Sequence, residues 1–378
     1  MQQANDPHPP RRGDADATAV DDSEAPAGRT RRGHGRVTLQ QVAEAAGVTK
    51  ITVSRYLREP QKVAPATAER IAQALAEHAY MPNKQAGMLA SGRSRMIAAI
   101  VPSLANSVFA ETVQGLAEGL QSAGYELMLA ASGYSLQREE EQVRAVLGWS
   151  PDALAVTGRH HTPATRALLR AAAEAGTPII EMWDWQPRSA EFTQVGFSHA
   201  EVGRAMARHF TEAGHSRLAY VDTGVESDYR AHERGQAFAA AAKAAGVEAQ
   251  TLTAPAGDAF EAGRAALVQL LDKAGRPTVD AMAFANDHLA CGAWLEAQQR
   301  GLEVPGRLAL MGFGDFPLSR QLGGGITSLR PPRYEIGRET AATMLALLDP
   351  AAEPPAARGS RQVAWSLVER ASSGRPAS

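Results

Sequence analysis

The feature that most constrains the fold is a regular alternation of short apolar runs and longer amphipathic segments, which begins near Met96. Strands that alternate with helices form parallel sheets with helices on both faces. The strand-like runs are residues 97–101, 125–130, 153–157, 178–182, 218–222, 281–285 and 308–313. The helical segments between them are residues 108–123, 137–149, 165–175, 201–213, 234–245, 260–273 and 289–300. About 270 residues of this pattern are too many for one such sheet, so we predict an α/β core of two similar lobes.

The position of a ligand site follows from this architecture. Sheets of this kind bind ligands at the carboxyl ends of their strands, and two lobes place those ends beside a common cleft. We therefore expect a small-molecule site between the lobes.

A small basic segment precedes this core. Residues 36–95 carry nine Lys/Arg and four Asp/Glu, whereas the whole chain has a net charge of −2. A basic module on an acidic body is typical of a protein of which one part contacts nucleic acid. A solvated basic face would give the same balance, so the charge alone leaves both interpretations open.

Capping signals divide the basic segment into three short helices. Thr38 followed by Gln41 matches a capping box, and the helix that begins at Leu39 ends at Gly47. Thr49 can cap a second helix, which ends before Pro60, and a third begins near Pro65. We therefore predict an all-α helix-turn-helix domain over residues 37–82.

The second helix carries side chains that suit DNA. Cations and hydroxyls bind phosphates and base edges, and an aliphatic group contacts a thymine methyl. These residues are Lys50, Ile51, Thr52, Ser54 and Arg55. The alternative is a protein-binding bundle with a solvated polar face.

Residues 83–95 are predicted to form a hinge helix and linker. Asn83 can cap, and Gly92 can end, a helix of roughly two turns, which is too short to be stable alone in water. The segment is either a plain linker or a hinge that folds on DNA. In the second case Leu89 is the expected minor-groove wedge, and Ala86 lets two backbones approach.

The pattern of the basic segment resembles a known family. The motif Thr38-Leu39-(x)2-Val42-Ala43-(x)2-Ala46-Gly47-Val48-Thr49-(x)2-Thr52-Val53-Ser54-Arg55 is similar to the headpiece of the lactose/galactose repressor (LacI/GalR) family. The Tyr80-x-Pro82-Asn83…Ala86…Leu89 stretch resembles that family's hinge helix. The resemblance implies DNA contacts by Thr38, Leu39, Thr49, Lys50, Ile51, Thr52, Ser54, Arg55, Asn83, Ala86 and Leu89. Ala64 departs from the family pattern, which has a Ser there, and this puts a phosphate contact at that position in doubt.

The core also resembles the family's effector-binding region, which is similar to periplasmic sugar-binding proteins. The matching pieces include Val101-Pro102-Ser103-Leu104-x-Asn106-x-x-Phe109 and Thr327-Ser328-Leu329-Arg330-Pro331. The expected organisation is a disordered tail over 1–36, an effector-binding and dimerisation domain over 96–370, and a disordered tail over 371–378. The first lobe is expected at 96–211 and 331–352, and the second at 212–330 and 353–370.

Within the family, two stretches look most like the gluconate-operon repressors. They are Thr157-x-Arg159-x-His161-Thr162-Pro163 and Glu181-x-x-Asp184. His232 stands where the family often has a sugar-clamping Arg, with Arg230 and Arg234 nearby. Such cations suit a carboxylate-bearing ligand, which favours a sugar acid, although they could instead meet acids of the protein itself. The candidate effector residues are Ser103, Phe109, Arg159, His161, Trp183, Asp184, Ser198, His232, Asn286 and Asp287, with Arg159 as the expected carboxylate partner.

Other chemistries are weaker interpretations of this sequence. His160-His161 lacks a third ligand at suitable spacing, so no metal is expected. Cys291 lies on an Ala/Leu-rich helix, which favours a core thiol over a nucleophile. Trp183 and Trp185 could either stack on a sugar ring or pack in the core. We expect neither an enzyme nor a cofactor.

The sequence thus predicts a DNA-binding transcriptional regulator, in the main interpretation a repressor of sugar-acid metabolism genes. Its expected partners are a pseudo-palindromic double-stranded DNA operator, a sugar or sugar-acid effector, and a second copy in a homodimer or higher oligomer. The alternative is a carbohydrate-binding protein without DNA function. With no signal-like apolar run at the start and a single cysteine, we expect a cytoplasmic location and no membrane contact.

Overall fold

The computed structural model describes residues 37–82, 87–88, 92–104, 107–186, 188, 190–349, 351 and 359–374. The chain divides into two compact units between Asn83 and Lys84. Of the predicted hinge residues, Asn83, Ala86 and Leu89 lie outside the described part, as does the tail over 1–36.

The first unit is a three-helix domain, as predicted. It contains α1 (Leu39–Ala45), α2 (Lys50–Arg58), the 3-10 turn η1 (Pro60–Lys62) and α3 (Pro65–Glu77). Thr38 and Gln41 form the predicted capping box, and the Thr49 hydroxyl accepts from the Thr52 backbone N–H. The helices close on a small apolar core of Val42, Ala43, Ala46, Val53, Ile71 and Ala74. This confirms the helix-turn-helix fold.

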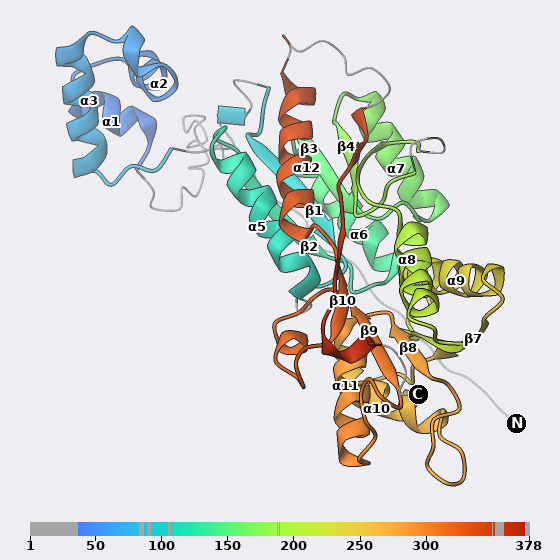
Figure 1. Ribbon diagram of the computed structural model, residues 1–378. Helices are drawn as coiled ribbons and strands as arrows, with labels where there is room; N and C mark the ends of the chain where they lie inside the picture. Colours follow the sequence, from blue (N-terminus) through green and yellow to red (C-terminus); the bar gives the residue numbers. More distant parts are fainter. Residues whose placement is uncertain are drawn as a thin grey trace, which may run out of the picture. The chain divides into compact units, whose positions relative to one another are not determined.

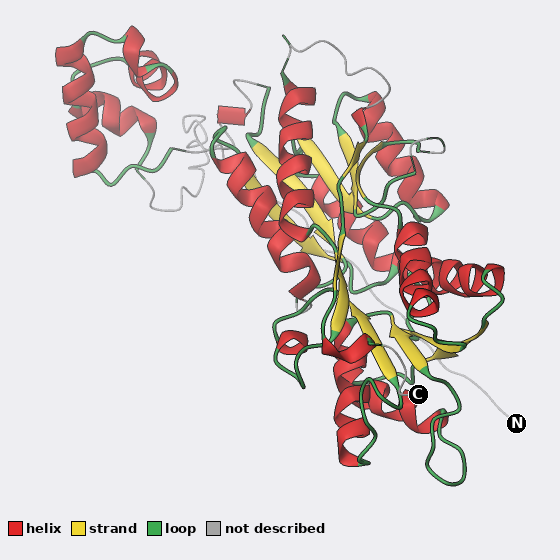
Figure 2. Cartoon of the chain, viewed as in Figure 1, coloured by secondary structure: helices red, strands yellow, loops and turns green. Residues whose placement is uncertain are grey.

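The second unit contains two six-stranded sheets, one in each lobe (Figures 1 and 2). The first sheet has the order β11-β5-β4-β3-β1-β2 and the second β12-β10-β9-β8-β6-β7. All pairings within the sheets are parallel except that between β10 and β12. The strands are β1 (Met96–Val101), β2 (Glu126–Ala131), β3 (Ala153–Thr157), β4 (Ile179–Met182), β5 (Thr193–Gly196), β6 (Arg217–Asp222), β7 (Glu248–Thr253), β8 (Ala281–Phe284), β9 (Ala309–Phe313), β10 (Thr327–Arg330), β11 (Arg361–Gln362) and β12 (Ser366–Val368).

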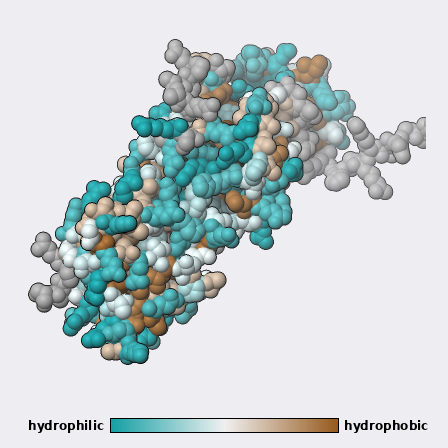
Figure 3. All heavy atoms as spheres, turned by 90° about the vertical axis from the view of Figure 1, so that its right-hand side faces the viewer, coloured by the Kyte–Doolittle hydropathy of each residue, from teal (hydrophilic) through white to brown (hydrophobic). Residues whose placement is uncertain are grey.

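Helices cover both faces of the sheets, which is the layering expected for parallel strands (Figure 2). They are α5 (Ser107–Gln121), α6 (Leu136–Leu147), α7 (Pro163–Glu174), α8 (His199–Glu212), α9 (Tyr229–Ala244), α10 (Ala259–Gln269), α11 (Asp287–Gln299) and α12 (Arg333–Leu348). Hydrophilic residues dominate the face of the molecule shown in Figure 3. Among the described residues, no helix has both the length and the apolar character to cross a membrane.

The structure moves the predicted boundary between the lobes. Helix α8, expected in the first lobe, packs along α9 of the second, so the chain crosses directly after β5. It crosses back at Pro331 and Pro332, and residues 363–365 make a further crossing between β11 and β12. The segment after α12 therefore contributes an edge strand to each lobe rather than to the second alone.

The C-terminal prediction was also wrong in part. Residues Ala371–Ser373 form a 3-10 turn instead of belonging to a disordered tail. The Ser372 hydroxyl donates to the Leu310 carbonyl, and the Ser373 hydroxyl donates to the Thr327 side chain. Hydrogen bonds to two strands of the second sheet thus fix this segment.

The packing of α5 against α12 requires glycine. A Cβ at Gly337 would lie 2.1 Å from the Thr112 carbonyl oxygen, and one at Gly115 would lie 2.3 Å from the Tyr334 carbonyl oxygen. The two backbones are therefore too close for any larger residue. The first lobe depends on this contact because α12 returns to it from the second lobe.

We expect Gly337→Ala to lower the free energy of unfolding by about 1–3 kcal/mol, since the methyl group must push the two helices apart. Chemical denaturation of the two proteins measures the difference. Ala342→Ser on the exposed face of α12 serves as the control and should change stability by less than about 0.5 kcal/mol. Equal effects of the two substitutions would contradict the close-packing argument.

Candidate ligand pocket and nucleic-acid interface

A cavity of about 540 Å³ lies between the two lobes. This volume is within the range of small-molecule sites. The first lobe contributes apolar and aromatic side chains, and the second contributes most of the polar groups. Its lining includes Phe109, Trp183, Arg230, Arg234, Asn286 and Phe313.

Arg234 is a buried cation that hydrogen-bonds only neutral groups. Its Nη1 lies 3.0 Å from His199 Nδ1, and its Nη2 donates to the Ala285 carbonyl at 3.0 Å. Its Nε is buried without a hydrogen-bond partner in the described part of the chain, and the guanidinium lies 4.1 Å from the centre of the Phe313 ring. Among the described residues no carboxylate forms an ion pair with it. A buried charge without a counter-charge is costly.

His199 acts as a neutral acceptor for Arg234. Burial lowers the pKa of His199 well below its ordinary value, and the nearby Arg234 and Arg230 lower it further. Because the guanidinium can only donate, Nδ1 must accept, and Nε2–H then donates to the Trp183 carbonyl at 2.9 Å. This imidazole fixes the position of Arg234 without neutralising its charge.

Arg230 brings a second cation to the same cavity. Its side chain lies one helical turn before Arg234 on α9, and the residue is only 6% exposed. Its guanidinium lies 5.2 Å from the centre of the Tyr229 ring, and within the described ranges it forms no close ion pair, although the charges of Asp228 and Asp184 act on it. Neither arginine is among the effector residues that the sequence predicts. Their spacing of four on one helix was the available signal.

Trp183 has an unusual backbone conformation and an indole N–H without a hydrogen-bond partner among the described residues. It has a φ of +71°, a strained value for a side chain of this size, and strain of this kind is concentrated at functional sites. Its Nε1 is buried without a hydrogen-bond partner among the described residues. Phe109 and Phe197 pack edge-on against the indole at centroid distances of 5.2 and 5.9 Å. The tryptophan thus packs between aromatic rings and also offers a donor at the cavity.

Arg159 does not line this cavity, contrary to its predicted role. It pairs with Asp184 on its own lobe and with Glu233 on α9 at 3.0 Å. The Tyr229 hydroxyl donates to Asp184 and accepts from the Arg159 backbone N–H, and Gln186 Nε2 donates to Glu233. These five residues form what we call the lobe clasp. Burial raises the pKa of Asp184 to about 6, against the opposing effect of Arg230 and Arg159.

The remaining predicted effector residues have different positions. Phe109, Trp183 and Asn286 line the cavity, and the Asn286 side chain also caps α11. Asp287 is fully buried and accepts from Phe316 N–H and from the hydroxyls of Ser319 and Ser328. Three further predicted residues, Ser103, Ser198 and His232, do not line the cavity. Ser198 caps α8, and His232 lies 3.7 Å from Asp222. The structure therefore brings only part of the predicted set together.

His161 lies beneath the lobe clasp in a buried cluster of charges. Its Nδ1 is 2.6 Å from Glu139 and its Nε2 is 3.5 Å from Glu181. Burial alone would lower the pKa of His161, but hydrogen bonds and charge from both glutamates raise it to about 9. It is therefore an imidazolium that supports the first lobe.

The start of α2 presents a free surface on the first unit. Ile51 is 69% exposed, and Lys50 and Arg55 are exposed without an ion pair within the described residues. The hydroxyls of Thr49 and Thr52 lie 2.9 Å apart at the helix start. Exposed cations, hydroxyls and an aliphatic side chain at one helix start are the groups that contact phosphates, base edges and thymine methyls.

Comparisons with known proteins agree with both units. Residues 38–83 match the model "Bacterial regulatory proteins, lacI family", and residues 207–373 match a periplasmic binding protein-like domain. The HTH-type transcriptional regulator GntR of Pseudomonas aeruginosa is 38% identical over 316 residues, which cover 83% of this chain and 90% of that protein. GntR of Escherichia coli is 34% identical, over 82% of this chain and 92% of its own length.

Solved structures show the same fold. A LacI-family regulator from Silicibacter pomeroyi is 32% identical, with a TM-score of 0.80 over 90% of this chain and all of that chain. The regulator GntR from Chromobacterium violaceum is also 32% identical, with a TM-score of 0.66 over 74% of this chain and 99% of its own. The lac repressor bound to operator is 24% identical with a TM-score of 0.78, over 90% of this chain and 99% of that chain, and supports the fold alone.

A helix-turn-helix domain joined to a two-lobed ligand-binding core defines the class of ligand-responsive transcriptional regulators. Because the two GntR relatives are 34–38% identical to this chain over about 90% of their own length, the chain belongs to the lacI family of bacterial regulatory proteins. It is a DNA-binding transcriptional regulator.

The buried His161 predicts an alkaline loss of stability. Its pKa rises from 6.5 to about 9 on folding, so its contribution is complete below about pH 6.5 and is lost as the pH rises to about 9. The shift corresponds to about 3 kcal/mol. Denaturant unfolding at several pH values should show this loss in the wild type but not in His161→Gln. If the free energies of unfolding of the wild type and of His161→Gln changed equally with pH, the raised pKa of His161 would be contradicted.

Proposed function

We propose that this regulator is a repressor whose operator affinity is controlled by a gluconate-type sugar acid bound between the lobes. One observation carries the proposal: Arg234, a buried arginine without an ion pair among the described residues, lines the cavity beside the buried Arg230. Arg230 lies near the Asp228 and Asp184 carboxylates, whereas Arg234 has only neutral hydrogen-bond partners among the described residues, so a ligand carboxylate would supply its counter-charge through charge-assisted hydrogen bonds. The resemblance of the sequence to gluconate-operon repressors supports the same class of ligand.

The rest of the cavity suits the rest of such a ligand. Trp183 Nε1 and the Arg234 Nε are unpartnered donors for oxygen atoms, and the Asp228 carboxylate can accept from hydroxyls. Phe109 and Phe313 provide apolar faces for the carbon chain. The cavity thus offers a short polyhydroxylated acid a cationic end for its carboxylate, several polar partners for its hydroxyls and an apolar wall for its carbon chain.

The ligand must act through the arrangement of the lobes. It can change operator affinity only by binding the DNA-competent and DNA-incompetent arrangements differently. The expected coupling is about 1–3 kcal/mol, or about 5–150-fold in operator affinity. We propose release from DNA as the direction of the effect.

We expect Arg230→Gln to weaken gluconate binding by at least about tenfold, because it removes a charge-assisted contact to the carboxylate. Titration calorimetry with gluconate and with glucose measures this loss and the preference for the acid. Lys243→Gln removes the same charge from the exposed end of α9 and should bind like the wild type. Tight binding of glucose alone would contradict the carboxylate assignment.

On the DNA side we propose a homodimer on a pseudo-palindromic operator. One recognition helix reads only a few base pairs, and a two-fold protein matches two half-sites. Lys50, Ile51 and Arg55 are the proposed base readers, Thr38, Thr49, Thr52 and Ser54 mainly position the backbone, and Leu39 is a further proposed DNA contact. We expect the protein to act in the cytoplasm, where bacterial DNA lies.

Arg55→Ala should cost about 1–3 kcal/mol of operator affinity and relax selectivity at one base pair, if Arg55 makes a bidentate base contact. Gel-shift titration against the operator and single-base variants measures both effects. Arg58→Ala removes the same charge from the other end of α2 and should not relax selectivity. Unchanged selectivity in Arg55→Ala would remove Arg55 from the reading set.

A further inference from the structure

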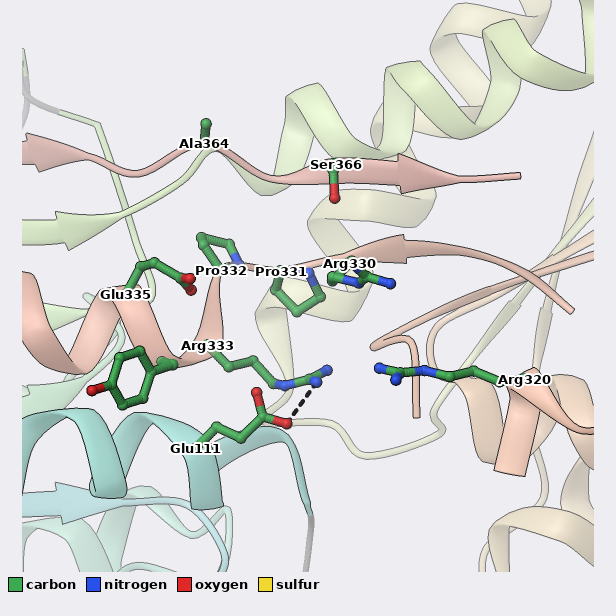
Figure 4. Close-up of a pocket in the computed structure, with 10 residues that line it drawn as sticks. Glu111, Arg320, Arg330, Pro331, Pro332, Arg333, Glu335, Ala364 and Ser366 are labelled. Carbon is green, nitrogen blue, oxygen red and sulfur yellow. Dashed lines mark hydrogen bonds and ion pairs between the residues drawn. The ribbon is translucent and has the colours of Figure 1, made fainter. Parts of the chain in front are cut away.

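A second cavity, of about 490 Å³, lies where the chain crosses between the lobes (Figure 4). Its walls come from α5, the start of α12, η2 (Leu318–Arg320) and the crossing before β12. It shares no residue with the cavity that contains Arg230 and Arg234. We call it the hinge cavity.

Three arginines converge on the hinge cavity. In Figure 4 the guanidinium groups of Arg320 and Arg333 face each other across the open space, and that of Arg330 points to the same region. The side chains of Arg320 and Arg330 are 42% and 44% exposed, whereas Arg333 is 5% exposed. Three like charges in one space repel one another unless anions compensate them, and among the described residues only two carboxylates, Asp315 and Glu111, pair with these three.

Carboxylates pair with all three arginines: Glu111, which lines the cavity, with Arg333, and Asp315, which does not line it, with Arg320 and Arg330. Asp315 is fully buried and pairs with Arg320, Arg330 and Arg370 at 3.0, 2.5 and 2.5 Å. Burial alone would raise the pKa of Asp315, but hydrogen bonds from Arg370 and Arg330 lower it below its ordinary value. Asp315 therefore fixes the positions of three guanidinium groups, but its single negative charge cannot neutralise all three.

Two further features leave donors without partners. Arg333 donates to the Gly314 carbonyl and to Glu111 at 2.8 Å, but its buried Nε has no partner among the described residues. Helix α12 begins here with Pro332 at its N-cap and no side-chain cap, so its positive end faces the cavity uncapped. Glu335 also lines the cavity, but Figure 4 shows it at the end away from Arg320 and Arg330.

We propose that the hinge cavity binds the phosphate group of a small organic phosphate. A tetrahedral dianion directs oxygens toward several guanidiniums at once, whereas a carboxylate offers two oxygens in one plane. The volume exceeds that needed for phosphate alone and admits a small organic body. Such a ligand contacts Arg320 of the second lobe and Arg333 of the first, and so stabilises the lobe arrangement seen here. The inference does not depend on the nature of the ligand between the lobes.

Calorimetry of the full-length protein with inorganic phosphate and with glycerol 3-phosphate, at constant ionic strength, tests the proposal. We expect both to bind, and Arg320→Gln to weaken them by at least about tenfold. Glycerol and acetate should not bind. Arg307→Gln removes one exposed positive charge elsewhere on the second lobe and should retain wild-type binding.

Two further variants assign the binding to this cavity. Arg330→Gln should repeat the loss, and since each substitution leaves Asp315 two arginines, thermal melting should show folded proteins. Arg230→Gln should keep phosphate binding, and Arg320→Gln should keep gluconate binding if the proposed function holds. No phosphate binding in the wild type, equal binding in Arg320→Gln, or loss in Arg230→Gln would overturn the proposal.

Discussion

The relation between the two lobes depends on the lobe clasp, in which Tyr229 and Glu233 of α9 hold Arg159, Asp184 and Gln186 of the first lobe. These contacts join the two lobes, and they lie next to Arg230 and Arg234 because Tyr229 and Glu233 are on the same helix, α9, as those two cations. Any rotation of the lobes that opens the cleft must break this buried ionic network. A ligand that competes with or strengthens it changes the balance between lobe arrangements.

Much of the fold could be predicted because its periodicity is strong. Seven strands and seven helices of the core were predicted in their observed places, and Thr38 and Thr49 cap the helices as expected. However, α9 begins at Tyr229 rather than at residue 234, α10 ends at Gln269 rather than at residue 273, and α12 was not predicted. The missed strands lack that signal. β7 is an edge strand with mostly exposed polar residues, and β5 buries Thr193 and Gln194 instead of an apolar run. The end of the chain was misjudged because its order comes from hydrogen bonds to distant strands.

The site was harder to predict because it depends on tertiary pairing. Arg159 and Arg234 look alike in the sequence, yet the first meets two carboxylates and the second meets an imidazole, a carbonyl and an aromatic ring. The sequence suggests His161 as a ligand contact, but in the fold its imidazole lies between Glu139 and Glu181. The family resemblance located the cleft, but only the fold shows that Arg234 has no carboxylate partner among the described residues.

The order of strands has a consequence for synthesis of the protein on the ribosome. The helix-turn-helix domain is complete once about the first 80 residues have emerged, because its core is local. Neither lobe is complete at any intermediate length: the first waits for α12 and β11, and the second waits for β12 and the turn at Ala371–Ser373. On a nascent chain the DNA-binding domain can therefore fold long before the ligand-binding core. Both lobes are completed only after residues 361–373 have emerged.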